Sequence, residues 1–120
     1  MAEDEPEIRY FLREILGRLG AEVVSAVDGE DAWNLWSLLG PFDLLITDQR
    51  MPRLTGMELL KRVRLDRPGF PVVIMSGYGL EEFADELARD LRLHYLPKPF
   101  LVPGLLEVVG KLLAESPPPT

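Results

Sequence analysis

Short apolar runs alternate along this chain with longer segments in which apolar residues recur every three or four positions. The runs are typical of buried β-strands and cover residues 22–26, 42–47, 71–75 and 93–96. The segments between them have the spacing of amphipathic helices and cover residues 6–20, 30–39, 55–67 and 80–90, with a last helix starting near 103. Strands that alternate with helices predict an α/β fold, a doubly wound parallel sheet with helices on both faces.

Two of the predicted helices carry local start signals. Pro6 suits the first turn of a helix, where its missing N–H costs nothing. Thr55 and Glu58 have the spacing of a capping box, in which each side chain accepts a hydrogen bond from the backbone of the other residue. These signals place the helix starts at about residues 6 and 55.

Length and composition narrow the classes of protein further. The 120 residues fit one domain, which we place at residues 1–114, followed by a Pro-rich tail over 115–120 that we expect to be disordered. The absence of cysteine excludes a disulfide scaffold, a Cys-ligated zinc module and an iron–sulfur protein. A net charge of −7 argues against direct nucleic-acid binding. Without a signal peptide or an apolar run of the roughly 18–20 residues that span a bilayer, we expect a cytoplasmic protein with no membrane contact.

Polar residues follow the predicted strands at the points where the strands end. Asp48, Ser76 and Lys98 come after three of the apolar runs, and Glu3 and Asp4 stand before the first helix. Ligands of open α/β sheets bind beyond the carboxyl ends of the strands, so we expect these side chains to meet. Carboxylates gathered in one pocket suit a hard cation such as Mg²⁺, and an aspartate beside that ion and an ammonium is a plausible nucleophile towards phosphorus.

Several segments match one protein family in order along the chain. They are an acidic cluster at 3–6 (Glu-Asp-Glu-Pro), a loop at 46–52 (Ile-Thr-Asp-Gln-Arg-Met-Pro), its continuation at 54–59 (Leu-Thr-Gly-Met-Glu-Leu), Ser76, Tyr95 and the run Lys98-Pro99-Phe100. Together they resemble the receiver domain of two-component response regulators, over nearly the whole chain. The resemblance implies the flavodoxin-like receiver fold, with strand order 2-1-3-4-5.

The resemblance also implies a role for each matched residue. Asp48 would accept a phosphoryl group, and Lys98 would neutralise the phosphoryl oxygens. Mg²⁺ would be held by Asp4, Asp48 and the backbone carbonyl of Arg50, with Glu3 reaching it through water. Ser76 and Tyr95 would be the switch residues, and the bond between Lys98 and Pro99 is a candidate for the cis form.

The partners implied by the family are a histidine kinase or a histidine phosphotransfer protein as phosphoryl donor. A downstream protein would bind the surface formed by the helix over 80–90, the strand over 93–96 and the last helix, and a homodimer is possible. A receiver promotes its own phosphorylation and dephosphorylation and is otherwise not an enzyme. We consider three settings: a free-standing regulator, a fragment of a longer regulator, and the receiver of a hybrid sensor kinase, whose kinase activity would lie outside this chain.

The chain departs from the family at its start, because only Met1 and Ala2 precede the acidic cluster. The first strand, central in the family's sheet, is largely absent, and we expect its neighbours to be unpaired and Glu3 and Asp4 to lose most of their support. Either the chain is trimmed, or another segment fills the position, or the sheet is defective; we favour trimming.

Two other functions compete with the phosphoacceptor. The altered start favours a non-phosphorylated pseudo-receiver that acts as a protein-interaction module, although Asp48, Ser76 and Lys98 are all present. A phosphatase with an aspartate nucleophile would carry a motif similar to Asp-x-Asp at that nucleophile. This chain has Asp48-Gln49-Arg50, so Arg50 stands where the second carboxylate would be.

Overall fold

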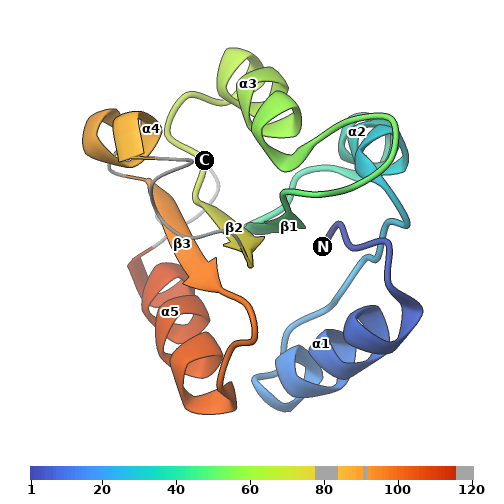
Figure 1. Ribbon diagram of the computed structural model, residues 1–120, viewed down its shortest axis with the longest axis vertical. Coiled ribbons are helices and arrows are strands. Elements are labelled where there is room, and N and C mark those ends of the chain that lie inside the picture. The colour runs from blue at the N-terminus through green and yellow to red at the C-terminus, as the bar shows by residue number, and fades with distance from the viewer. Residues whose placement is uncertain (78–83, 91, 116–120) are drawn as a thin grey trace.

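The computed structural model describes residues 1–77, 84–90 and 92–115 (Figure 1). Its helices are α1 (Pro6–Arg18), α2 (Gly29–Leu39), α3 (Gly56–Asp66), α4 (Ala84–Arg89) and α5 (Val102–Glu115). Its strands are β1 (Leu45–Asp48), β2 (Val72–Ser76) and β3 (Leu93–Pro97). The start of the helix predicted over 80–90, and the predicted tail apart from Glu115, lie outside the described residues. Within the described ranges, no helix is long and apolar enough to cross a membrane.

The strands form a parallel sheet in which β2 lies between β1 and β3. Ala2 continues this sheet beyond β1, since it forms parallel bridges with Thr47 of β1 and with Ala26. The spatial order is therefore Ala26, Ala2, β1, β2, β3, which is the predicted order 2-1-3-4-5. At the first two places in this order, Ala26 and Ala2, the pairing consists of isolated bridges.

Two expectations about this end of the sheet are wrong. The strand predicted over 22–26 is not formed: its parallel bridge to the N-terminal segment is confined to Ala26, and the Val24 carbonyl accepts one further hydrogen bond, from the Met1 ammonium group. Glu3 does not lack support either. Ala2 donates to the Ile46 carbonyl at 2.8 Å and accepts from the Asp48 N–H at 2.9 Å, while Glu3 donates to the Ala26 carbonyl at 3.1 Å. The segment Met1–Glu3 therefore fixes the start of the acidic cluster between Ala26 and β1.

The helices cover the two faces of the sheet as predicted (Figure 1). Successive residues of a strand point to opposite faces, so Val73 and Met75 pack in the apolar core with α1 and α5. Val72 and Ile74 pack in the other core, with α2 and α3. Both cores are closed by leucines at helical spacing, such as Leu105 and Leu112 of α5. This buried frame fixes the carboxyl ends of the strands relative to one another.

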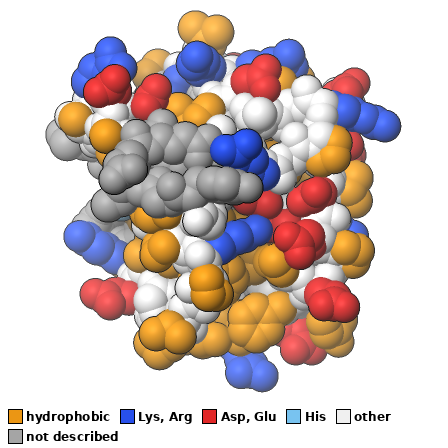
Figure 2. Space-filling view, viewed as in Figure 1, with side chains coloured by type: hydrophobic (Ala, Val, Ile, Leu, Met, Phe, Trp, Pro, Cys, Tyr) orange, Lys and Arg blue, Asp and Glu red, His pale blue; other side chains and the backbone are white. Residues whose placement is uncertain are grey.

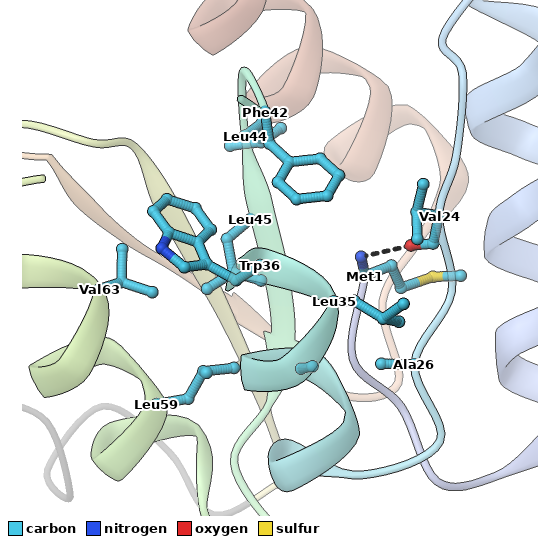
Figure 3. A pocket seen from close by; sticks show the side chains of 11 residues that line it. Met1, Val24, Ala26, Leu35, Trp36, Phe42, Leu44, Leu45, Leu59 and Val63 are labelled. Atoms are coloured by element: carbon cyan, nitrogen blue, oxygen red, sulfur yellow. Dashed lines mark hydrogen bonds between the residues drawn. The ribbon is translucent and has the colours of Figure 1, made fainter. Parts of the chain in front are cut away.

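Close to Met1, the core between the sheet and α2 contains a cavity of about 40 Å³ (Figure 3). Its lining is apolar and includes Leu35 and Trp36 of α2 and Leu45 of β1. The Met1 ammonium group donates to the Val24 carbonyl at 2.9 Å at its edge. The cavity lies among side chains of the core rather than among the polar residues at the strand ends.

The local start signals are confirmed. Pro6 stands in the first turn of α1. The Thr55 hydroxyl accepts from the Glu58 N–H at 3.2 Å, and the Glu58 carboxylate accepts from the Thr55 N–H at 3.0 Å. The bond between Lys98 and Pro99 is cis, as expected, and so is the bond between Gly40 and Pro41.

An ion pair fixes α3 to the segment that leads into β3. Arg64 donates from Nε to Asp90 Oδ2 at 2.7 Å and from Nη2 to Asp90 Oδ1 at 3.1 Å. Its Nη1 donates to the Phe70 carbonyl just before β2. Burial acts to raise the pKa of Asp90, but hydrogen bonds from Arg64 and from the Arg92 N–H outweigh it and hold this pKa below its ordinary 3.8. The ionised form of Asp90 therefore stabilises the fold.

We predict that Asp90→Asn lowers the free energy of unfolding by about 1–2 kcal/mol at pH 7, because the charge-assisted pair with Arg64 is lost. A pKa lowered by folding stabilises above the pKa of the unfolded chain and ceases to do so as the pH falls through the folded value. The difference from wild type should therefore shrink below about pH 4. Urea unfolding across this range measures it, with exposed Asp85→Asn as the control. Equal losses for the two variants would contradict the prediction.

Candidate functional site

The last residue of β1, Asp48, is held by backbone on both sides. Its N–H donates to the Ala2 carbonyl at 2.9 Å, and the N–H of the next residue, Gln49, donates to the Met75 carbonyl at 3.0 Å. The side chain is nearly buried, with 5% of the residue exposed. The sheet thus presents one carboxylate at its carboxyl edge, in the place that the sequence predicted.

Lys98, which follows β3, joins this carboxylate to a second one. Its Nζ lies 3.1 Å from Asp48 Oδ2 and 3.0 Å from Glu3 Oε2. Its backbone N–H donates to the Ser76 carbonyl at 2.9 Å, which ties the lysine to the end of β2. One ammonium group therefore bridges carboxylates from the start of the chain and from β1.

Glu3 is fully buried, and both of its side-chain oxygens have partners. Oε2 accepts from Lys98, and Oε1 accepts from the Glu5 N–H at 3.1 Å, next to the start of α1. Burial raises the pKa of Glu3 from its ordinary 4.5 to about 7, although the hydrogen bonds from Lys98 and Glu5 act to lower it. Burial also acts to lower the pKa of Lys98, but its bonds to Glu3 and Asp48 outweigh this and raise it, so the lysine is held charged.

Asp4 completes a group of three carboxylates. One oxygen each from Glu3, Asp4 and Asp48 lies within 4.8 Å of the other two, and Asp4 is more accessible than the buried pair. Figure 2 shows acidic side chains gathered over the N-terminal segment and the start of α1 on this face. Even when Glu3 is protonated, two carboxylates face one ammonium group, so negative charge is in excess, and all the donors are oxygens. This set fits a small, hard divalent cation such as Mg²⁺.

The two predicted switch residues are joined by a hydrogen bond. Ser76 is buried at the end of β2, and its carbonyl accepts from the Tyr95 hydroxyl at 3.1 Å as well as from the Lys98 N–H. Tyr95 is half-buried on β3 and packs against the core that contains Val72 and Ile74. A displacement of Ser76 would therefore act directly on Tyr95 and Lys98.

The loop between β1 and α3 is fixed by two residues whose roles the sequence did not reveal. The Gln49 side chain is buried, and its Oε1 accepts from the Met57 N–H at 2.8 Å in the first turn of α3. Gly56 packs so closely that an added Cβ would lie 2.6 Å from the Asp48 carbonyl oxygen. Arg50, two residues beyond Asp48, lies in this loop and is exposed. In the sequence, the signal for these roles is limited to a polar residue, Gln49, that stands between Asp48 and the capping box of Thr55 and Glu58.

Comparisons with known proteins agree with this geometry. The family model of the response regulator receiver domain matches residues 1–110. The chain is 35% identical over 119 residues to the DNA-binding transcriptional regulator NtrC of Azospirillum brasilense, covering 99% of this chain and 24% of that protein. It is 32% identical over 117 residues to the sensor kinase CckA of Brucella abortus, covering 97% of this chain and 12% of that protein. The crystal structure of the receiver domain of NtrX from Brucella abortus superposes with a TM-score of 0.83 at 31% identity, covering 96% of this chain and 97% of that one. The chain thus spans about a quarter of NtrC and a smaller part of CckA.

The close packing of Gly56 gives a test of the loop geometry. We predict that Gly56→Ala lowers the free energy of unfolding by about 2 kcal/mol, because the new methyl group must displace the backbone at Asp48. Gly69→Ala is the matched control, since nothing lies within 4 Å of the Cβ it would add. Urea unfolding followed by tryptophan fluorescence measures both. A loss at Gly56 no larger than that at Gly69 would show that the loop adapts freely.

Proposed function

The chain belongs to the response regulator receiver domain family of two-component signalling, and on that premise we propose that Asp48 is its phosphoacceptor. The observation that carries this proposal is the contact of Lys98 Nζ with Asp48 at 3.1 Å. It brings a carboxylate and an ammonium group together at the carboxyl edge of the sheet, which supports the roles of nucleophile and phosphate-neutralising cation. The donor would be a phosphohistidine of a histidine kinase or a histidine phosphotransfer protein.

The transfer itself needs little from the protein beyond position and charge. A carboxylate oxygen of Asp48 attacks phosphorus, the bond from phosphorus to the imidazole nitrogen breaks, and its electron pair stays on that nitrogen. The product is an acyl phosphate on Asp48. Lys98 contacts the carboxylate before transfer, and its ammonium group balances the charge of the phosphoryl oxygens afterwards. The cis bond that follows Lys98 lies in the short connection from β3 to α5.

The oxygen donors of the site would hold Mg²⁺ through Asp4, Asp48 and the backbone carbonyl of Arg50, with Glu3 acting through water. The ion supplies further neutralisation of the phosphoryl oxygens. The three carboxylates that lie together support this assignment. The ion pair of Glu3 with Lys98, and the greater accessibility of Asp4, favour Asp4 as the direct ligand and Glu3 as the indirect one.

A donor must reach Asp48 from solvent, and a groove opens beside Lys98. It has a volume of about 430 Å³ and is lined by Glu7, Ile8, Phe11, Lys98, Pro99 and Phe100. Figure 2 shows apolar side chains gathered between α1 and α5 on this face. An apolar helix face of the donor protein, with its phosphohistidine directed at Lys98, fits this lining.

The signal would leave through the hydrogen bond between Tyr95 and Ser76. A phosphoryl group on Asp48 would draw the Ser76 hydroxyl towards its oxygens, and the Ser76 carbonyl holds both the Tyr95 hydroxyl and the Lys98 N–H. Movement of Ser76 therefore alters the surface of α4, β3 and α5, where we place the downstream partner. Switches of this kind couple a local change in charge to an element with two arrangements.

The pseudo-receiver alternative loses its main support in the structure. It depended on a chain start too short to hold the acidic cluster. Glu3 is instead bound through its backbone to Ala26 and through its side chain to Lys98. A phosphoacceptor is therefore the function that the geometry supports best.

We predict that the protein gains one phosphoryl group from acetyl phosphate with Mg²⁺, and that Asp48→Asn abolishes the gain. The amide cannot form the acyl phosphate, although its size is nearly unchanged. Intact-mass spectrometry measures the increase in mass. Phosphate that survives acid treatment is subtracted, because an acyl phosphate is acid-labile. Asp43→Asn, which changes an exposed aspartate just before β1, serves as the control. Labelling of Asp48→Asn at the wild-type rate would place the acceptor elsewhere.

A further inference from the structure

Arg9 in the first half of α1 turns back towards the acidic cluster. Its Nη1 donates to the Glu3 carbonyl at 2.8 Å and approaches the Asp4 carbonyl at 3.4 Å. Its backbone N–H donates to the carbonyl of Glu5, the N-cap residue, at 3.0 Å, which is the first backbone hydrogen bond of α1. The side chain is half-buried, so this guanidinium is partly withdrawn from solvent to serve two backbone oxygens.

These two carbonyls belong to the segment on which the site depends. Glu3 is fixed by its neighbours, since its N–H binds the Ala26 carbonyl and its carboxylate binds Lys98 and the Glu5 N–H. Asp4 follows immediately, between this anchor and the start of α1 at Pro6. The backbone carbonyl of Asp4 is contacted by the guanidinium of Arg9, which restrains the Asp4 backbone. The direction of the Asp4 carboxylate follows from the direction of that backbone.

We propose that Arg9 is a positioning residue for the cation site, which it serves by holding the backbone of Glu3 and Asp4 from the side of α1. This inference rests on the proposed function, because the cation is the one that the phosphoacceptor site would bind. The guanidinium of Arg9 contacts backbone carbonyls rather than the side-chain oxygens that would bind the cation. It fixes the segment that carries the ligand Asp4, as outer residues of metal sites commonly do.

The charge of Arg9 and its position have opposite effects on cation binding. A guanidinium near three carboxylates repels a divalent cation, so loss of its charge alone should tighten binding. Loss of its hydrogen bonds should release the Asp4 backbone and weaken binding. The sign of the change in affinity therefore separates a positioning role from a role of charge alone.

The test is a titration of the full chain with MgCl2, followed by the amide chemical shifts of Glu3, Asp4 and Glu5 in NMR spectra. Arg9→Met removes both the charge and the hydrogen bonds. Arg13→Met is the matched control, because Arg13 lies one turn further along α1, is exposed and carries the same charge. Arg9→Lys and Arg13→Lys form a second pair, which keeps the charge and serves if Arg9→Met does not fold.

We expect Arg9→Met to raise the dissociation constant for Mg²⁺ about tenfold. Arg9→Lys should rescue part of this loss, since an ammonium group can still donate to a carbonyl. Arg13→Met should leave the constant unchanged or lower it slightly, and Arg13→Lys should not change it.

Two results would overturn the inference. If the wild type binds Mg²⁺ and Arg9→Met binds it as tightly as Arg13→Met or more tightly, Arg9 acts through its charge or not at all, and the proposed function stands. If the wild type shows no shift at these amides on adding Mg²⁺, the cation site of the proposed function fails, and the inference fails with it.

Discussion

The ammonium group of Lys98 between the carboxylates of Glu3 and Asp48 is the interaction on which the rest of the site depends. It joins residues 95 positions apart in the chain, and none of the three side chains is more than 17% exposed. Carboxylates this deeply buried are costly unless a cation and hydrogen bonds compensate them, and removal of one partner leaves the others uncompensated. The contact therefore couples the start of the chain, the end of β1 and the end of β3 at one point.

Much of the surrounding structure serves to bring these three groups together. The alternating side chains of β2 bind a helix pair on each face, which sets the strand ends side by side. Ala2 pairs with β1 and Ala26, and Glu3 follows it directly, so this pairing sets the position of Glu3. Gln49 and Gly56 fix the loop after Asp48, and Arg9 fixes the backbone before α1. Asp4 is the accessible acid of the cluster, whose other two carboxylates are buried.

The parts of this structure that depend on periodicity could be predicted from the sequence, and the parts that depend on single contacts could not. The helices and the strands over 45–48, 72–76 and 93–97 follow from apolar spacing, and Asp48 and Lys98 follow from their places at the carboxyl ends of two of those strands. The prediction of a strand over 22–26 is wrong because a strand also needs a neighbouring segment to pair with, and β-propensity does not reveal how far such pairing extends. Gln49 and Arg9 could not be assigned, because their roles depend on side chains that turn back to backbone atoms of a neighbouring segment.

A double-mutant cycle on Glu3 and Lys98 tests the central claim most directly. The free energies of unfolding of the wild type, Glu3→Gln, Lys98→Met and the double variant would be measured in urea without divalent cations at about pH 8, above the Glu3 pKa of about 7, so that Glu3 is ionised. Lys98→Met should cost about 3 kcal/mol in the wild type, since two buried carboxylates lose their cation. It should cost at least about 1 kcal/mol less in the Glu3→Gln background, where one of those charges is already absent, and Lys61→Met should cost little in either. Additive effects within about 0.5 kcal/mol would show that the two side chains do not depend on each other, and would contradict the account.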